Sequence, residues 1–282
     1  MDLNLMCVLL GFIIPFMWVM EGVRGGLGAV SRDIFVLAGQ SNMAGRGGVV
    51  GGKWDGKVPA ECGPSPWVWR LSAELEWEEA REPLHADIDV TKTCGVGPGM
   101  AFANEVLRGG GGPVGLVPCA VGGTKIGEWS RGSRLYDELV KRVKRAMGLG
   151  RIRGLLWYQG ESDTVREEDS ESYKDKMERL IVDLRLDLEL PSLLVIQVAL
   201  ASGEGKFVER VRRAQMEMKM ANVECVDAKG LSLNADKLHL TTTAQVHLGI
   251  KLAHAYLNST TYRNQIHHTQ SYQPRHAFFP TS

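Results

Sequence analysis

Short, continuous apolar segments alternate with longer amphipathic segments along most of the chain. Five of the apolar segments are rich in Val, Ile and Leu, which predicts strands buried on both faces of a parallel sheet. They are Asp33–Ala38, Val114–Cys119, Gly154–Tyr158, Leu193–Ala199 and Val223–Asp227. Amphipathic spacing predicts helices over Gly99–Leu107, Leu135–Met147, Ser170–Leu190 and Phe207–Met220, and a last one from Thr242 through Leu257. At the start of the last helix, Thr242 and Gln245 have the spacing of a capping box.

This alternation predicts an α/β fold, a three-layer α/β/α sandwich with a central, mostly parallel five-stranded sheet and right-handed crossovers. The pattern contains no internal repeat and no second domain. In an open parallel sheet, ligands bind beyond the carboxyl ends of the strands. The segments that directly follow each strand are therefore where functional side chains are expected.

The two ends of the chain differ from this pattern. Residues 1–30 contain the apolar run Leu5–Met20, which predicts a hydrophobic leader or anchor, although Asp2 stands where a signal peptide usually carries Lys or Arg. Residues 259–282 have no apolar period and predict a disordered tail. We therefore expect one domain over residues 31–258, in the secretory pathway or outside the cell, with or without a retained membrane anchor. A cytoplasmic location is the alternative.

Composition narrows the classes of partner. The 282 residues include 33 basic and 33 acidic side chains, a net charge of zero that gives no broad attraction for nucleic acid. The one basic cluster, Lys141–Arg145, falls in a predicted helix and is interpreted as a solvated face. The five cysteines form no CxxC pair, which excludes a zinc knuckle or redox motif. The four outside the leader permit two disulfides without requiring any, and structural thiols are the default.

Two polar segments follow the first and last predicted strands. GQSNMAG presents Ser41 on a tight turn between glycines, where a hydroxyl can stand clear and backbone N–H groups can face an oxyanion. The alternative is a plain turn with Ser41 as a helix cap. Past the last strand, Asp236 precedes His239 by three residues, and such a carboxylate can bond Nδ1–H and leave Nε2 as a base. This spacing alone is a weak signal, because Asp and His are both common at helix starts. The signal is stronger here because the pair follows the last predicted strand, where functional side chains are expected.

Two more segments follow the second and third strands. The paired glycines Gly122 and Gly123 let the backbone approach a ligand and donate N–H groups, unless the segment is a plain turn. Gln159 ends the third strand, either as an amide donor to a developing negative charge or as a strand-end hydrogen bonder. One motif is rejected: Gly47–Lys53 fits GxxxxGK, but Trp54 stands where a nucleotide site needs Ser or Thr.

Taken in order, these four segments resemble the SGNH hydrolase superfamily (GDSL-type esterases). They are most similar to its carbohydrate esterase branch, the sialate O-acetylesterase and acetylxylan esterase-like proteins, including plant members. The resemblance spans about Asp33 to Tyr256, and its most specific motifs are GQSNMAG, QGESD and DKLHLT. It implies a flavodoxin-like sandwich with Ser41 as nucleophile, His239 as base and Asp236 as the carboxylate that orients the base.

The resemblance also implies an oxyanion hole made by the backbone amides of Ser41 and Gly123 and by Gln159, which stands where many superfamily members have Asn. Gly122 would replace Gly123 if the register differs by one. Glu161 and Asp163 are expected to be structural hydrogen bonders that fix the Gln159 loop. From its position near the paired glycines, Trp129 is a hypothetical apolar wall for a sugar ring.

The implied activity is that of a serine esterase that removes O-acetyl groups from carbohydrate through an acyl-enzyme. Such a reaction requires no metal and no organic cofactor. Its partner is an acetylated carbohydrate, and membrane contact would involve only the N-terminal apolar segment. Two alternatives stay open: a glycan-binding protein on a catalytically silent hydrolase fold, and an esterase for lipid or other short-chain acyl groups.

Overall fold

The computed structural model describes residues 31–259 and Tyr262. The predicted leader over residues 1–30 lies outside the described residues, as does nearly all of the predicted tail over 259–282. Within the described residues, no helix has both the length and the apolar character needed to cross a membrane.

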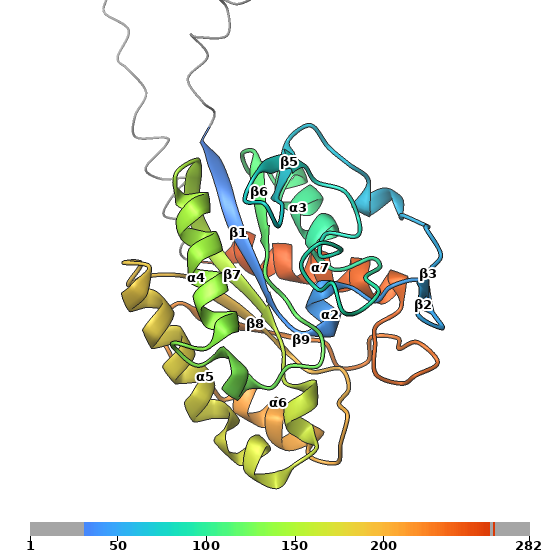
Figure 1. The fold of residues 1–282 in the computed structure, drawn as a ribbon, viewed down its shortest axis with the longest axis vertical. Helices are drawn as coiled ribbons and strands as arrows, with labels where there is room; N and C mark the ends of the chain where they lie inside the picture. The colour runs from blue at the N-terminus through green and yellow to red at the C-terminus, as the bar shows by residue number, and fades with distance from the viewer. Residues whose placement is uncertain (1–30, 260–261, 263–282) are drawn as a thin grey trace, which may run out of the picture. The chain divides into compact units, whose positions relative to one another are not determined.

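A seven-stranded sheet forms the middle layer, in the order β5-β4-β6-β1-β7-β8-β9 (Figure 1). Its strands are β1 (Arg32–Gly39), β4 (Val68–Leu71), β5 (Trp77–Glu79), β6 (Val114–Pro118), β7 (Gly150–Tyr158), β8 (Val195–Ala199) and β9 (Val223–Asp227). All neighbours pair in parallel except β5, which runs antiparallel to β4. A separate hairpin pairs β2 (Val49–Val50) with β3 (Lys53–Trp54).

The sheet therefore has two strands more than the five predicted. All five apolar segments form strands, and the two missed strands, β4 and β5, lie together at one edge. Their sequences, VWRL and WEE, are short and mix Trp with charged residues. β5 is the edge strand, and β4 beside it is only partly buried, so both keep contact with water and apolar periodicity gives little signal there.

Helices cover both faces of the sheet. They are α2 (Ser41–Ala44), α3 (Gly99–Arg108), α4 (Arg134–Met147), α5 (Glu167–Asp187), α6 (Val208–Met216) and α7 (Thr242–Asn258), with 3₁₀-helices η1 (Ala60–Cys62), η2 (Ile126–Trp129) and η3 (Glu161–Thr164). Figure 1 shows α3 and α7 on one face and α4 and α5 on the other, and α6 packs against α5. The predicted three-layer α/β/α sandwich is confirmed.

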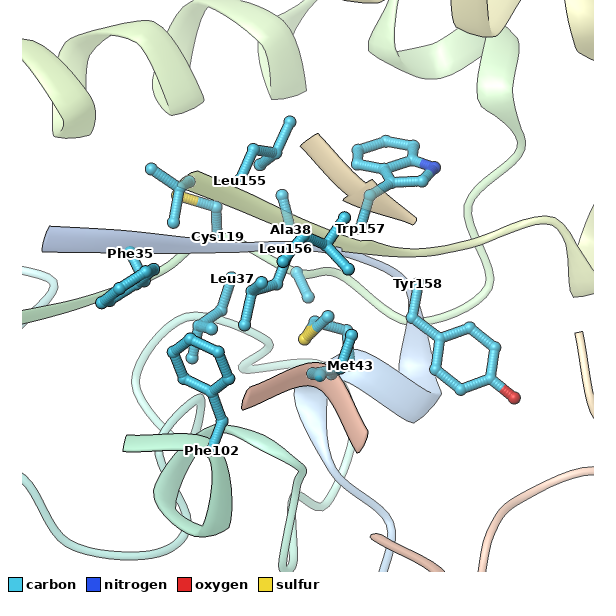
Figure 2. Packing of buried hydrophobic residues seen from close by; sticks show 14 of the residues in the cluster. Phe35, Leu37, Ala38, Met43, Phe102, Cys119, Leu155, Leu156, Trp157 and Tyr158 are labelled. Carbon is cyan, nitrogen blue, oxygen red and sulfur yellow. The ribbon is translucent and has the colours of Figure 1, made fainter. Parts of the chain in front are cut away.

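The core lies on both sides of β1 and β7. Figure 2 shows Met43 and Phe102 on one side of these strands, and Leu155 and Trp157 on the other. Phe102 also meets Phe35 of β1 edge-on, with ring centroids 4.8 Å apart. Strands packed on both faces bury every side chain, which explains why their sequences are continuously apolar.

The predicted capping box of α7 is wrong by one residue. Thr241, not Thr242, is the N-cap, and its Oγ1 accepts a hydrogen bond from the N–H of Ala244. The side chain of Gln245 turns inward instead and donates to the backbone oxygen of Asn42 at 3.0 Å. The start of the last helix is thereby tied to the turn that follows β1.

The predicted solvated face of Lys141–Arg145 is wrong for one residue. Lys141, Lys144 and Arg145 are exposed, but Arg142 is buried and donates to three backbone oxygens, those of Leu71, Ser72 and Pro118. Because a guanidinium carries five donors, one buried Arg can satisfy several strand-end carbonyls at once. Arg142 therefore joins α4 to the ends of β4 and β6.

All four described cysteines are free thiols, and Cys62, Cys94 and Cys119 are buried. Burial raises the pKa of the Cys94 and Cys119 thiols to about 11. A thiol that stays protonated at neutral pH is a poor nucleophile, so these cysteines fit the structural role predicted for them.

Candidate active site

Ser41 lies just beyond the carboxyl end of β1, as the first residue of α2. The preceding Gly39 adopts φ +128°, and a Cβ there would lie 2.1 Å from the backbone oxygen of Tyr158, so the turn requires glycine. Gln40 is the N-cap of α2, which makes the alternative of Ser41 as helix cap wrong. The first N–H groups of a helix have no intrahelical acceptor, and the N–H of Ser41 has no acceptor within the described chain.

Ser41, His239 and Asp236 form one hydrogen-bonded chain. The Oγ of Ser41 lies 2.9 Å from Nε2 of His239, across a separation of 198 residues in sequence. On the other side of the ring, Nδ1 lies 2.7 Å from Oδ2 of Asp236. With a proton on Nδ1, the lone pair of Nε2 faces the serine hydroxyl, which is the arrangement a general base requires.

Asp236 is held in place by three donors. Its Oδ1 accepts the backbone N–H groups of Leu238 and His239 at 2.9 and 3.0 Å, in addition to the bond from the imidazole. Burial acts to raise the pKa of Asp236, but the hydrogen bonds from His239 and Leu238 outweigh it and lower the pKa. The group is therefore an anionic acceptor at neutral pH, suited to stabilise a protonated imidazole.

A hollow of about 210 Å³ opens beside the serine hydroxyl. Its lining consists of Ser41, Arg46, Lys92, Gly122, Gly123, Glu204, Leu238 and His239. Gly123 adopts φ +77°, and a Cβ on it would meet no atom within 4 Å. The N–H of Gly122 donates to Oδ2 of Asp89 at 3.1 Å, whereas that of Gly123 has no acceptor in the described residues. Of the two glycines that the sequence left open, Gly123 is the one with a free donor.

A buried ion pair between Arg46 and Asp89 supports this wall of the hollow. Asp89 is fully buried, and its Oδ2 accepts from both Arg46 and the N–H of Gly122. Arg46 also donates to the backbone oxygen of Gly45 at 2.9 Å. A buried carboxylate near a forming oxyanion would oppose it, and the guanidinium compensates that charge. Sequence reasoning missed this pair, because Arg46 and Asp89 are 43 residues apart and no motif marks Asp89.

The prediction that Gln159 donates to an oxyanion is contradicted. Its side chain is fully buried and does not line the hollow. The amide nitrogen donates to Oδ2 of Asp163 at 2.6 Å, to the backbone oxygen of Thr124 at 2.8 Å and to Oε1 of Gln40 at 3.2 Å. An amide nitrogen has two protons, and both already have acceptors. Gln159 is instead a strand-end hydrogen bonder that joins β7 to the loops after β1 and β6.

The hypothesis of Trp129 as an apolar wall for a sugar ring is wrong. The side chain is fully buried, its Nε1 donates to Oγ1 of Thr124, and its ring meets that of Trp157 edge-on at 5.2 Å. A ring with no exposed surface cannot contact a ligand. Trp129 belongs to the core.

Glu161 and Asp163 are buried carboxyl groups with neutral donors. Asp163 accepts from Gln159 and from the N–H of Ile126, and Oε1 of Glu161 accepts from Nδ2 of Asn42 at 2.8 Å. Burial, as the largest cause, raises the pKa of Glu161 to about 7 and that of Asp163 to about 6. These contacts are those of structural hydrogen bonders.

We expect Glu161 and Asp163 to lower the stability of the protein as pH rises from about 4 to about 7. The unfolded chain ionises both groups near pH 4, whereas the folded chain holds the proton of Asp163 up to about pH 6 and that of Glu161 up to about pH 7, so over this window both groups favour unfolding as pH rises. A pKa raised from 4.5 to about 7 corresponds to roughly 3 kcal/mol for Glu161. Urea unfolding at pH 5 and pH 8 measures the difference. Glu161→Gln should change this difference by about the same amount, the exposed control Glu74→Gln should not, and a difference that Glu161→Gln leaves unchanged would contradict the assignment.

A second hollow, of about 240 Å³, shares Arg46, Lys92 and His239 with the first. The rest of its lining is Val49, Gly51, Gly52, Thr93, Asn234 and Asp236. Part of this wall is the β2–β3 hairpin, which contains most of the GxxxxGK sequence and is followed only by the short 3₁₀-helix η1, not directly by an α-helix. Among the described residues, no group of three or more His, Cys, Asp or Glu side chains is arranged to hold a metal ion.

Comparison with known proteins identifies the family. The family model described as "Carbohydrate esterase, sialic acid-specific acetylesterase" matches residues 31–258. A protein of Arabidopsis thaliana described as a "Probable carbohydrate esterase" is 57% identical over 238 residues, which are 81% of this chain and 91% of the relative.

Solved structures share the fold of this chain. A crystal structure from Arabidopsis thaliana matches with a TM-score of 0.79 and 56% identity, over 81% of this chain and 99% of that one. NanS matches with a TM-score of 0.64 and 16% identity, over 82% and 98% of the two chains. A carbohydrate acetylesterase from Xanthomonas citri matches with a TM-score of 0.61 and 19% identity, over 82% and 57%. The last two, at low identity, show a shared fold. On the family model and the close relative, the chain belongs to the carbohydrate esterase family of the sialic acid-specific acetylesterases, and it is a carboxylic ester hydrolase.

Proposed function

We propose that the protein removes O-acetyl groups from carbohydrate by covalent catalysis, with Ser41 as nucleophile, His239 as general base and Asp236 as the orienting carboxylate. The observation that carries the proposal is the hydrogen-bonded chain of these three side chains, with contacts of 2.9 and 2.7 Å. Membership of the carbohydrate esterase family supplies the substrate class, an acetylated carbohydrate.

In the first half of the reaction, His239 Nε2 takes the proton of the Ser41 hydroxyl as Oγ attacks the acetyl carbonyl carbon. The carbonyl oxygen becomes the oxyanion of a tetrahedral intermediate, and the free N–H groups of Ser41 and Gly123 are its donors. The imidazolium is stabilised by Asp236. It then gives its proton to the sugar oxygen as the ester C–O bond breaks, which leaves acetyl-Ser41 and the free sugar alcohol.

In the second half, a water molecule takes the place of the sugar. His239 accepts a proton from this water as the water oxygen attacks the acetyl carbon. The second tetrahedral intermediate that forms has its oxyanion bonded to the same two N–H groups, those of Ser41 and Gly123. The intermediate collapses when His239 returns the proton to Oγ of Ser41. Acetic acid, which ionises to acetate, leaves, and the starting enzyme is restored.

The two hollows suit the two parts of such a substrate. The first, about 210 Å³, contains the nucleophile and the amide of Gly123 and suits the acetyl group. The second, lined by Thr93, Asn234 and backbone at Gly51, offers polar groups to sugar hydroxyls. Lys92 lines both hollows and can bond to a sugar held between them.

Labelling with a fluorophosphonate tests the proposal. We expect one phosphonyl group per chain, attached to Oγ of Ser41, and loss of acetate release in proportion to labelling, because the reagent reacts with an activated serine. Peptide mass spectrometry locates the label. An unlabelled protein that still binds acetylated glycans would favour the silent glycan-binding alternative. A higher kcat/KM for octanoyl than for acetyl esters would favour a lipid esterase.

A further inference from the structure

We propose that Asn42 is a positioning residue for this reaction: held by the buried carboxyl group of Glu161, its side chain fixes the backbone on both sides of His239 and keeps the imidazole in line with Ser41. The inference rests on the proposed function, since it concerns the same site. Asn42 and Glu161 do not line the hollow beside the serine, so their effect would pass through His239.

The side-chain amide of Asn42 makes hydrogen bonds to the backbone on both sides of His239. Asn42 directly follows Ser41 and is fully buried. Its Oδ1 accepts the N–H of Leu240 at 2.9 Å, and its Nδ2 donates to the backbone oxygen of Leu238 at 3.3 Å. These are the two chain neighbours of His239. The side chain adjacent to the nucleophile therefore holds the peptide groups that flank the base.

The segment that carries His239 needs such a tie. It lies between β9 and α7 in no helix or strand of the sheet, Asp236 and Lys237 are exposed, and Lys237 adopts φ +58°. Ser202 provides another tie from outside the segment, donating to the backbone oxygen of Leu238 at 2.5 Å. Proton transfer depends steeply on the Oγ–Nε2 distance, and a displacement of about 1 Å can cost on the order of 100-fold in rate.

Glu161 determines which way the Asn42 amide points. Oε1 of Glu161 accepts from Nδ2 at 2.8 Å, and the N–H of Leu240 can bond only to an acceptor. One orientation of the amide satisfies both groups, and the flipped orientation leaves the N–H of Leu240 without an acceptor. The carboxyl group of Glu161 thus fixes the orientation in which Asn42 can hold Leu240.

The groups that face Glu161 are neutral or acidic. Asp163 lies on the same 3₁₀-helix η3, Glu204 follows β8, Tyr158 ends β7, and Tyr173 comes from α5. Burial, with smaller contributions from Glu204 and Asp163, raises the pKa of Glu161 to about 7. Oε1 can accept from Asn42 whether or not the group is ionised, so the native pair works across neutral pH.

The substitution N42D gives the sharpest test. It keeps the shape and the acceptor for Leu240 but places a second carboxyl group against Glu161. Two carboxyl groups in contact share one proton at low pH and repel each other once both ionise. We therefore expect the kcat of N42D relative to wild type to fall about tenfold or more between pH 5.5 and pH 8.5 as the flanking peptides shift. KM should change little.

The double variant N42D/E161Q exchanges the two groups, so that residue 42 carries the carboxyl group and residue 161 the amide. The Gln amide can donate to the introduced carboxylate, so we expect its kcat relative to wild type to be independent of pH and about tenfold above that of N42D at pH 8.5. Gln197→Ala is the matched control, because it removes a fully buried side-chain amide of β8 that donates to the backbone oxygen of Gln215 and has no hydrogen bond to Asn42 or to the segment of His239. It should lower the melting temperature with no pH-dependent change in relative kcat.

A pH-independent ratio for N42D, or a double variant as impaired as N42D at pH 8.5, would overturn the inference. Should N42D not fold, Asn42→Ala adds no charge and is measured instead: we expect a loss of kcat on the order of 100-fold, and wild-type kcat in the folded variant would overturn the inference too. These failures are distinct from failure of the proposed function, which is shown by wild-type activity in Ser41→Ala.

Discussion

Ser41→Ala is expected to lower kcat for 4-nitrophenyl acetate and for acetylated sugars by about a millionfold, because loss of the nucleophile of a serine hydrolase removes the covalent route entirely. The alanine protein should keep its fold. Oγ has one hydrogen bond, to His239, and Ser41 lines the hollow, so loss of the hydroxyl leaves no closed cavity in the core. Initial rates and thermal melts of wild type and variant measure both quantities.

The matched control is Ser192→Ala, which makes the same chemical change on an exposed residue in the connection before β8. It should retain full activity. A Ser41→Ala protein that hydrolyses either substrate at more than about one hundredth of the wild-type rate would show that Ser41 is not the nucleophile, since loss of a triad serine costs far more than that.

The parts of the site that the sequence predicted are those fixed by chain order. Ser41 and Gly123 follow the buried strands β1 and β6, and His239 follows β9, which is an edge strand with one buried residue rather than a strand buried on both faces. Parallel strands bring their carboxyl ends to one edge of the sheet. Because β1 and β6 are largely apolar, their positions and hence this edge of the sheet follow from the apolar pattern. The Asp236–His239 contact is local, three residues apart, and a motif can therefore express it.

The errors concern the direction of side chains. Gln159 and Trp129 also follow strands, but Gln159 turns to Asp163 and Gln40, and Trp129 turns into the core beside Trp157. Whether a side chain at a strand end faces the hollow or the interior depends on partners that come from other segments. Neither apolar period nor spacing contains that information.

The residues that sequence reasoning missed act through long-range polar contacts. Asn42 meets Glu161 across 119 residues and Leu240 across 198, and Asp89 meets Gly122 across 33. Asn42 lies inside the GQSNMAG motif, so a signal was present, but the motif does not say what the amide bonds to. Buried polar groups are nearly always hydrogen-bonded, so a structure gives their roles directly.

Asp236→Asn is expected to lower kcat by about 10⁴-fold, the cost known when the carboxylate of a serine protease triad becomes an amide. Three donors point at this carboxylate: the N–H groups of Leu238 and His239, and Nδ1–H of the imidazole. An amide has one oxygen. If that oxygen accepts the backbone N–H groups, the amide nitrogen faces Nδ1, which must then be the unprotonated acceptor. The proton moves to Nε2, and the ring can no longer take a proton from Ser41.

Asp55→Asn is the matched control, because Asp55 also accepts a backbone N–H, that of Lys57 at 2.9 Å, in an exposed loop. It should keep wild-type kcat. The two active-site variants should also differ from each other: the Asp236→Asn protein keeps Oγ and should still be labelled slowly by a fluorophosphonate, whereas Ser41→Ala should not be labelled at all. An Asp236→Asn protein with kcat within about tenfold of wild type would mean that something other than this carboxylate sets the tautomer of His239.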